Sequence, residues 1–237
     1  MIVLKGVGKK YQMNQVETQA LRNVNLTIQE GEFVSVMGPS GSGKSTLMNV
    51  IGLIDSMSDG EYYYRNQLVS AYNEKQRTNL RKLNMGFVFQ KFYLIDELSV
   101  YNNIEIPLSF FNHSAKEKKK RVLSIMERLH ITDLAHKKPI DLSGGQQQRV
   151  AVARALVHSP QVVLADEPTG NLDSKNGEEV IRLFREFNQD GTTIVMITHS
   201  ENYARMGSRV INLFDGEIVT DNFFENIRQT HQKKGFY

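Results

Sequence analysis

Residues 38–46 read Gly38-Pro39-Ser40-Gly41-Ser42-Gly43-Lys44-Ser45-Thr46. This stretch fits the pattern G-x-x-x-x-G-K-[S/T] of a phosphate-binding loop. Its glycines let the backbone curl so that N–H groups surround phosphate oxygens, and a helix starting near Lys44 directs the positive end of its dipole at the same anion. Lys44 adds a charge for the β- and γ-phosphates, and the Ser45 hydroxyl can ligate Mg²⁺. The stretch therefore predicts a nucleoside-triphosphate site.

Two short apolar runs indicate buried strands that end at this site. Phe33–Met37 leads directly into the loop, as a buried strand of a parallel sheet would. Residues 161–166 form a second such run, which ends on Asp166 and is followed by Glu167. Ligands of parallel α/β sheets gather at the carboxyl ends of strands. Asp166 is therefore placed to hold Mg²⁺ through its water shell, and Glu167 to accept a proton from the attacking water.

Strand and helix patterns alternate along the rest of the chain, which indicates an α/β fold with a parallel sheet. Residues 221–237 are polar and aperiodic, so a loosely held tail is expected there. Apolar alternation and β-branched runs predict strands at 24–28, 61–69 (a hairpin), 85–89, 192–198, 209–214 and 217–220, and helical spacing predicts helices at 114–129 and 180–187.

The composition excludes several classes of protein. The 237 residues include no cysteine, which excludes disulfides, thiolate zinc sites, iron–sulfur clusters and catalytic thiols. The net charge of +3 is too small to favour a nucleic-acid partner. No apolar run is long enough to span a membrane, and the first residues do not resemble a secretion signal. A cytosolic protein is expected.

The segment Leu142-Ser143-Gly144-Gly145-Gln146 narrows the class further. Two glycines and a serine leave backbone N–H groups and a hydroxyl at a helix N-terminus, which makes a second anion-binding site. The economical explanation for two phosphate cradles in one chain is that the second serves the nucleotide of another subunit.

With these motifs, the chain resembles the ATP-binding-cassette family over about residues 1–220, and Leu142–Gln146 matches the family's signature motif. The resemblance implies that Gln90 senses Mg²⁺ and the attacking water, that His199 contacts the γ-phosphate, and that Tyr11 stacks on adenine. Residues 171–173 match the loop that contacts the opposite subunit. The implied nucleotide-binding residues are Tyr11, Gly38, Pro39, Ser40, Gly41, Ser42, Gly43, Lys44, Ser45, Thr46, Ser143, Gly144, Gly145 and Gln146; the implied Mg²⁺ residues are Ser45, Gln90 and Asp166; and the implied catalytic residues are Glu167, His199 and Gln90.

The resemblance also implies an architecture and partners. The expected fold is an α/β nucleotide-binding cassette with a parallel-sheet core, an N-terminal antiparallel β subdomain and an inserted α-helical subdomain at about residues 91–155. Residues 1–220 would form one ATPase domain and residues 221–237 its tail. ATP and Mg²⁺ are the expected cofactors, and no nucleic acid is expected. A second copy would close a head-to-tail dimer on ATP. A separate integral-membrane permease, docked near residues 90–107, would keep the chain in the cytoplasm on the inner face of the membrane.

Residues 87–90, 103–108 and 165–173 resemble one branch of the family, which contains lipoprotein-release, macrolide-export, antimicrobial-peptide-resistance and cell-division cassettes. An ATPase coupled to transport of an envelope substrate is therefore expected: a lipoprotein, a macrolide or an antimicrobial peptide. A regulatory ATPase that gates a membrane partner without moving cargo, as in the cell-division members, stays open. A cassette acting on DNA or ribosomes is disfavoured, because no coiled coil, zinc site or second cassette is present. A kinase or GTPase is disfavoured by the signature segment.

Overall fold

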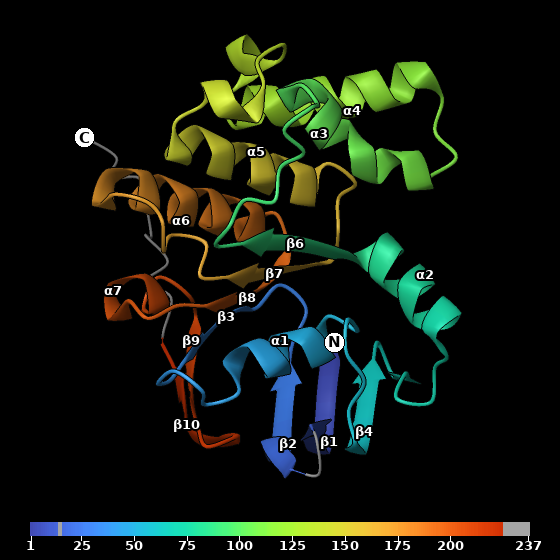
Figure 1. The fold of residues 1–237 in the computed structure, drawn as a ribbon, viewed down its shortest axis with the longest axis vertical. Helices are drawn as coiled ribbons and strands as arrows, with labels where there is room; N and C mark the ends of the chain where they lie inside the picture. The colour runs from blue at the N-terminus through green and yellow to red at the C-terminus, as the bar shows by residue number, and fades with distance from the viewer. Residues whose placement is uncertain (14–15, 225–237) are drawn as a thin grey trace, which may run out of the picture.

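The computed structural model describes residues 1–13 and 16–224, which form two sheets with helices around the larger one (Figure 1). The smaller sheet is antiparallel and confirms the strand expected at 24–28 and the hairpin expected at 61–69. Arg65 and Asn66 form its turn with left-handed backbone (φ 48° and 64°). Its strand order is β2-β1-β4-β5, with β1 at Ile2–Met13, β2 at Val16–Ile28, β4 at Asp59–Tyr64 and β5 at Gln67–Leu68.

The larger sheet has a parallel core, as predicted. Strands β9, β3, β8, β7 and β6 pair in parallel, and β10 pairs with β9 in the antiparallel sense. Because neighbouring strands are far apart in the sequence, each parallel pair requires a crossover through another element. The strand order is β10-β9-β3-β8-β7-β6, with β3 at Phe33–Met37, β6 at Met85–Phe89, β7 at Val162–Asp166, β8 at Thr193–Ile197, β9 at Arg209–Phe214 and β10 at Glu217–Phe223.

The parallel strands are buried on both faces, since their side chains alternate between two hydrophobic cores. In β7, Val162 and Leu164 pack into the core shared with the antiparallel sheet, whereas Val163 and Ala165 pack into the core beneath the helices. Apolar burial on each side stabilises the sheet by roughly 25 cal/mol per Å². A strand covered on both faces reads as an unbroken apolar run, which is why the sequence pattern predicted it.

The helices cover both faces of the larger sheet (Figure 1). Helix α1 packs on the face that also carries the antiparallel sheet, and α3 to α6 pack on the other face. The bounds are α1 Lys44–Ile51, α2 Glu74–Asn84, α3 Val100–Glu105, α4 Ala115–Arg128, α5 Gly144–Leu156, α6 Ser174–Gln189 and α7 Glu201–Ala204, with short 3₁₀ segments at Ile106–Phe110, Thr132–Leu134 and Pro139–Asp141. Among the described residues, none of these helices has the length and hydropathy needed to cross a bilayer.

The loose tail was expected from residue 221, but β10 continues to Phe223. Asp221 lies opposite Ile211 of β9, and Arg209 donates a hydrogen bond of 2.6 Å to each of its carboxylate oxygens. This part of β10 is an exposed edge strand, so it shows no apolar alternation from which its length could be predicted. Residues 225–237, the rest of the expected tail, lie outside the described residues.

Candidate functional site

The loop at 38–46 joins β3 to α1, as the sequence predicts. Gly38 (φ 149°) and Gly43 (φ 100°) have backbone conformations that side chains with a Cβ rarely adopt. Space is a second constraint, because a Cβ on Gly38 would strike the carbonyl oxygen of Leu213 and one on Gly43 would strike that of Ala20. The glycines are therefore required by the way the loop fits between β9 and β2.

Lys44, the first residue of α1, is buried within the loop. Its Nζ donates hydrogen bonds to the carbonyl oxygens of Gly38 at 3.0 Å and Pro39 at 2.7 Å. Burial lowers the pKa of Lys44, while the carboxylates of Glu167 and Asp166 act in the opposite direction. An ammonium group with three donors, held inside a curled backbone, is suited to bind an oxyanion.

The loop hydroxyls fit a nucleotide with Mg²⁺. The hydroxyl of Ser42 is buried and has no hydrogen-bond partner among the described residues. Leaving such a group unpaired costs about 1–3 kcal/mol, and a phosphate oxygen could accept its hydrogen bond. The hydroxyl of Ser45 lies near the carboxylate of Asp166 and acts to lower the pKa of that carboxyl. This pair offers the oxygen ligands that Mg²⁺ prefers.

Neighbouring parallel strands end in one row at this edge of the sheet. The register pairs Phe89 of β6 with Asp166 of β7, Asp166 with Ile197 of β8, and Ile197 with Val36 of β3. The phosphate loop begins just beyond β3, so it emerges from the same row. The chain therefore brings to one edge three residues that are far apart in the sequence: Gln90, Glu167 and His199.

Glu167 and His199 are in direct contact, with His199 Nε2 at 2.8 Å from Glu167 Oε1. Glu167 has a left-handed backbone (φ 46°), and its N–H donates to the carbonyl oxygen of Ile197 at 3.0 Å. Burial and the charge of Glu167 raise the pKa of the neighbouring Asp166, while nearby Ser45 and Lys44 act to lower it. Non-glycine residues with positive φ cluster at functional sites, because strain persists only where the surroundings hold it.

Gln90 contacts the loop that follows β7. Its Nε2 donates to Asn171 Oδ1 at 3.5 Å, and Asn171 Nδ2 donates to the Gln90 carbonyl at 3.0 Å. A Cβ on Gly170 would lie 2.6 Å from Gln90 Nε2, so the glycine allows this close approach. Among the described residues, no hydrogen bond joins Gln90 to Glu167. The structure thus brings Gln90 to the same edge, where its partner is Asn171.

The segment Leu142–Gln146 opens α5, which packs on the sheet face opposite α1. Ser143 Oγ accepts a hydrogen bond from the Gln146 N–H at 3.3 Å, and Gln146 Oε1 accepts one from the Ser143 N–H at 3.0 Å. This capping box fixes the start of the helix. No hydrogen bond within the described part of the chain joins this segment to residues 38–46. The two predicted phosphate cradles are therefore not brought together within one chain.

Tyr11, the predicted adenine-stacking residue, lies half-buried on β1. Its hydroxyl donates to Asp55 Oδ2 at 2.7 Å, and Lys9 Nζ lies 4.8 Å from the centroid of its ring. Sequence reasoning missed both neighbours. The sequence could have predicted that Lys9 lies beside Tyr11, because residues two apart on a strand share one face. No sequence pattern predicts the contact with Asp55, which is an acid in a loop 44 positions from Tyr11.

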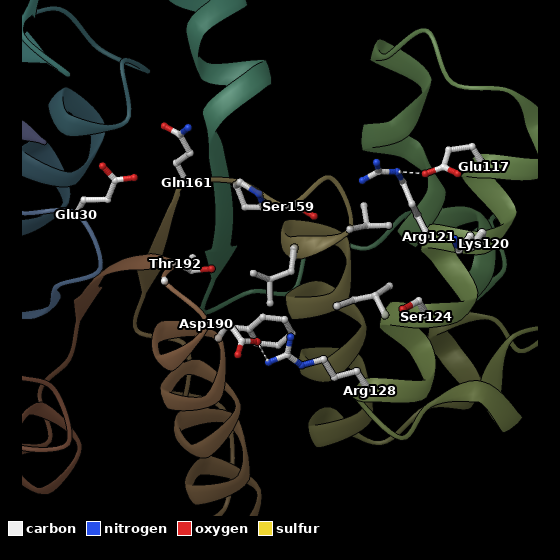
Figure 2. Close-up of a pocket in the computed structure, with 16 residues that line it drawn as sticks. Glu30, Glu117, Lys120, Arg121, Ser124, Arg128, Ser159, Gln161, Asp190 and Thr192 are labelled. Carbon is white, nitrogen blue, oxygen red and sulfur yellow. Dashed lines mark hydrogen bonds and ion pairs between the residues drawn. The ribbon is translucent and has the colours of Figure 1, made fainter. Parts of the chain in front are cut away.

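A separate cleft of about 550 Å³ opens at the other end of the parallel strands (Figure 2). Gln161 and Thr192 line it just before β7 and β8 begin. Arg128 of α4 spans it to Asp190 through an ion pair of 2.6 Å, and its guanidinium carbon lies 3.6 Å from the centroid of the Phe187 ring. None of the residues that line this cleft is a predicted site residue, so the cleft is separate from the nucleotide site.

Comparison with known proteins identifies a family. The family model described as ABC transporter matches residues 21–170. The uncharacterized ABC transporter ATP-binding protein MJ0796 of Methanocaldococcus jannaschii is 49% identical over 223 residues, which cover 92% of this chain and 95% of that protein. The macrolide export ATP-binding/permease protein MacB of Escherichia coli is 43% identical over 222 residues, which cover 94% of this chain but 34% of MacB.

A solved structure agrees in fold. It is the dimeric, post-hydrolysis state of the ATP-binding cassette MJ0796 bound to ADP and Pi, with a TM-score of 0.88 at 46% identity, covering 95% of this chain and all of that one. The predicted cassette fold, with its parallel core, antiparallel N-terminal sheet and inserted helices, is confirmed. So are the predictions of an ATPase and of ATP with Mg²⁺ as its cofactors. The chain belongs to the ABC transporter family, in which it is the ATP-hydrolysing subunit.

Proposed function

We propose that the chain drives a separate membrane permease as a homodimer that closes head to tail on two ATP molecules. The observation that carries the hydrolytic part of this proposal is the contact of 2.8 Å between Glu167 and His199, at the strand ends from which the phosphate loop also emerges. A carboxylate that can take a proton from water, held by an imidazole beside a phosphate cradle, suits hydrolysis of a triphosphate.

ATP binds along residues 38–46, with the loop N–H groups and Lys44 on the phosphates. Ser45 and Asp166, whose side chains lie near each other, would hold Mg²⁺ together with Gln90. When bound, the ion offsets negative charge on the β- and γ-phosphates. We assign the nucleotide to Tyr11, Gly38, Pro39, Ser40, Gly41, Ser42, Gly43, Lys44, Ser45 and Thr46 of one copy.

In the reaction itself, Glu167 is the general base. One of its carboxylate oxygens takes a proton from the water that attacks the γ-phosphate. His199, whose Nε2 lies 2.8 Å from Glu167 Oε1, orients that carboxylate and contacts the γ-phosphate. Gln90 lies at the next strand end and places the water. Such positioned proton transfer contributes about 10²- to 10⁴-fold to a rate.

A second copy completes each site. Helix α5 packs on the sheet face away from α1, so the exposed Ser143 and the half-buried Gly144 are available to the ATP of another subunit. Gly145, also assigned to that site, is buried against Asn176, where a Cβ would not fit. Gln146 holds Ser143 through the capping box. In a twofold dimer each copy gives its signature segment and receives the other's, which makes two equal sites. The dimeric form of the MJ0796 cassette supports this assembly.

An apolar groove of about 350 Å³ is the proposed docking site of the permease. It lies between α2, the start of β6 and the end of α5. Phe110 lines the groove with 61% of its surface exposed, which favours burial against a partner. The groove is lined by Thr78, Arg81, Lys82, Met85, Gly86, Phe87, Pro107, Phe110, Arg154, Ala155 and His158.

Arg154 connects this groove to the catalytic edge. Its guanidinium donates to the carbonyl oxygens of Tyr93 at 2.5 Å and Phe92 at 2.8 Å, just after Gln90. Movement at the groove would thus reach the segment that carries Gln90.

Docking of the permease in this groove would hold the chain in the cytoplasm at the inner face of the cell membrane. We treat residues 1–220 as one cassette, with residues 91–155 as its helical subdomain.

The proposed cargo is an envelope substrate: a lipoprotein, a macrolide or an antimicrobial peptide. Support comes from MacB, which is named for macrolide export and is 43% identical to this chain. The match covers 34% of the length of MacB, whose name joins an ATP-binding part to a permease.

The test of the proposed function is Glu167→Gln. The amide keeps the shape of the side chain but cannot take a proton, so ATPase activity should fall by about 10²-fold or more while ATP still binds. Size-exclusion chromatography with ATP should then show a stable dimer that the wild-type protein loses on hydrolysis. Glu186→Gln, an exposed change on α6, is the matched control. Wild-type turnover by Glu167→Gln would show that Glu167 is not the base.

A further inference from the structure

Lys9 is an unusual residue on β1, because its side chain is almost fully buried. Its Nζ donates hydrogen bonds to Asp55 Oδ1 at 2.7 Å and to the Ser56 carbonyl at 2.6 Å. A lysine without such partners would be costly to bury. Lys9 and Asp55 therefore form a built ion pair, which joins β1 to the loop after α1.

The same carboxylate holds Tyr11. Asp55 Oδ1 accepts from Lys9, and its Oδ2 accepts from the Tyr11 hydroxyl at 2.7 Å. Burial and this hydrogen bond raise the pKa of Tyr11 above its ordinary value, at which a tyrosine hydroxyl is already a donor at neutral pH. Burial raises the pKa of Asp55, but the bonds from Lys9 and Tyr11 outweigh it and leave that pKa below its ordinary value. The charged carboxylate thus holds both side chains.

Lys9 also covers the aromatic ring. Its Nζ lies 4.8 Å from the centroid of Tyr11, within the range of a cation–π interaction. One ring face therefore carries an ammonium group, and a flat base can stack on the other face. The ring is held by its hydroxyl at one end and by the cation on its face, so stacking on it requires no further ordering of the side chain.

We propose that Lys9 and Asp55 are positioning residues for the purine base of the nucleotide. They fix the Tyr11 ring, with the Lys9 ammonium on one face, so that the ring can receive adenine on its other face. This inference rests on the proposed role of Tyr11. It adds that recognition of the base, separately from recognition of the phosphates, depends on an ion pair that does not itself touch the nucleotide.

The experiment compares two ligands of the full chain by isothermal titration calorimetry: Mg²⁺ with ATP, and Mg²⁺ with inorganic triphosphate, which has no base. Lys9→Met and Asp55→Asn should each weaken ATP binding by about three- to tenfold and leave triphosphate binding unchanged. In turnover assays KM for ATP should rise while kcat holds, and Lys9→Arg should restore much of the affinity. Lys5→Met, which removes a similar ammonium over the Tyr63 ring, is the matched control.

Each possible result decides the inference. If the variants bound ATP and triphosphate equally weakly, the Lys9–Asp55 pair would support only the loop and α1, not the base. If they bound ATP as the wild type does, the pair would have no role in nucleotide binding. Either outcome overturns the proposal. Tyr11→Ala is a separate arm. If that variant bound ATP as the wild type does, the proposed role of Tyr11 itself would fail. Thermal melting of every variant checks folding, and Tyr11→Phe, which loses only the hydroxyl, is the mildest probe.

Discussion

Glu167 takes a left-handed backbone conformation, which a non-glycine residue keeps only where its surroundings hold it (φ 46°). Two contacts do so here: the bond from its N–H to the Ile197 carbonyl, and the contact of its carboxylate with His199. The carboxylate is therefore fixed before any substrate arrives. Pre-set geometry of this kind is what electrostatic catalysis needs, since the groups do not have to reorganise during the reaction.

At this scale we expect His199→Ala to lower kcat by about 10²-fold or more and to leave ATP affinity within a few-fold. The reason is that the loop and Lys44 hold most of the triphosphate, whereas His199 orients the carboxylate of Glu167 and contacts only the γ-phosphate. Steady-state ATPase assays and calorimetry measure the two effects separately. His136→Ala changes an exposed histidine and is the control. A wild-type kcat for His199→Ala would remove His199 from the mechanism.

Asp55 predicts a pH effect on stability. Its pKa in the folded chain lies below the value of 3.8 expected when unfolded, so the stabilisation linked to its charge is complete above about pH 3.8 and is lost as the pH falls through the folded pKa. The stability advantage of the wild type over Asp55→Asn should be constant near neutral pH and shrink in acid. Urea unfolding of both proteins across this range measures it, and an advantage that grew in acid would contradict the assignment.

The helix N-termini show how one residue type serves two purposes. Ser114 caps α4 and Ser143 caps α5, each by accepting the N–H three residues on. Such caps are worth about 1 kcal/mol. At Ser143 two glycines follow: Gly144 adds no side chain at the helix start, which an anion can approach, and Gly145 packs against Asn176. A serine cap therefore stabilises the start of α4, and at the start of α5 it also belongs to a proposed ligand site.

We expect Ser143→Asp to abolish hydrolysis without loss of stability or of ATP binding to the monomer. Aspartate caps a helix as well as serine does, but its charge would repel the γ-phosphate offered by the second copy. ATPase assays, thermal melting and calorimetry separate these effects. Ser114→Ala is the converse control, since it should lose stability and keep its turnover. Normal hydrolysis by Ser143→Asp would rule out the composite site.

In the whole molecule, hydrolysis and the proposed docking of a partner lie at different places on the larger sheet. Its carboxyl edge carries the phosphate loop together with the pair Glu167 and His199. The groove around Phe110 lies at the start of β6, at the opposite end of that strand from Gln90. Arg154 lies between them, with one side on the groove and its hydrogen bonds on the segment after Gln90. A partner in the groove would thus be joined to the catalytic edge through α5.

We expect Phe110→Asp to weaken association with the partner permease by about tenfold or more, because a charge would replace an aromatic anchor in an apolar groove. Co-purification from membranes that contain both proteins measures this. Val219→Asp, an equally polar change at an exposed site on β10, should leave association intact. If the two variants behaved alike, the permease would not dock in this groove.

The sequence by itself determined the features that depend on local spacing. The phosphate loop, the acids after β7, the signature segment and most parallel strands follow from residues close together in the chain, because glycine geometry, helix caps and apolar runs are local properties. The length of β10 could not be predicted in this way. Its final residues are exposed and polar, and their pairing with β9 depends on Arg209 and Asp221.

Only the tertiary structure decided which of these pieces meet. Strand order and register place Glu167 against His199 and Gln90 against Asn171, although the members of the latter pair are 81 positions apart. The contact of Lys9 and Tyr11 with Asp55, the separation of the two phosphate cradles and the groove at Phe110 also arise from packing. Periodicity in a sequence states which face of an element is buried, but the neighbour it is buried against is set by the free energy of the whole fold.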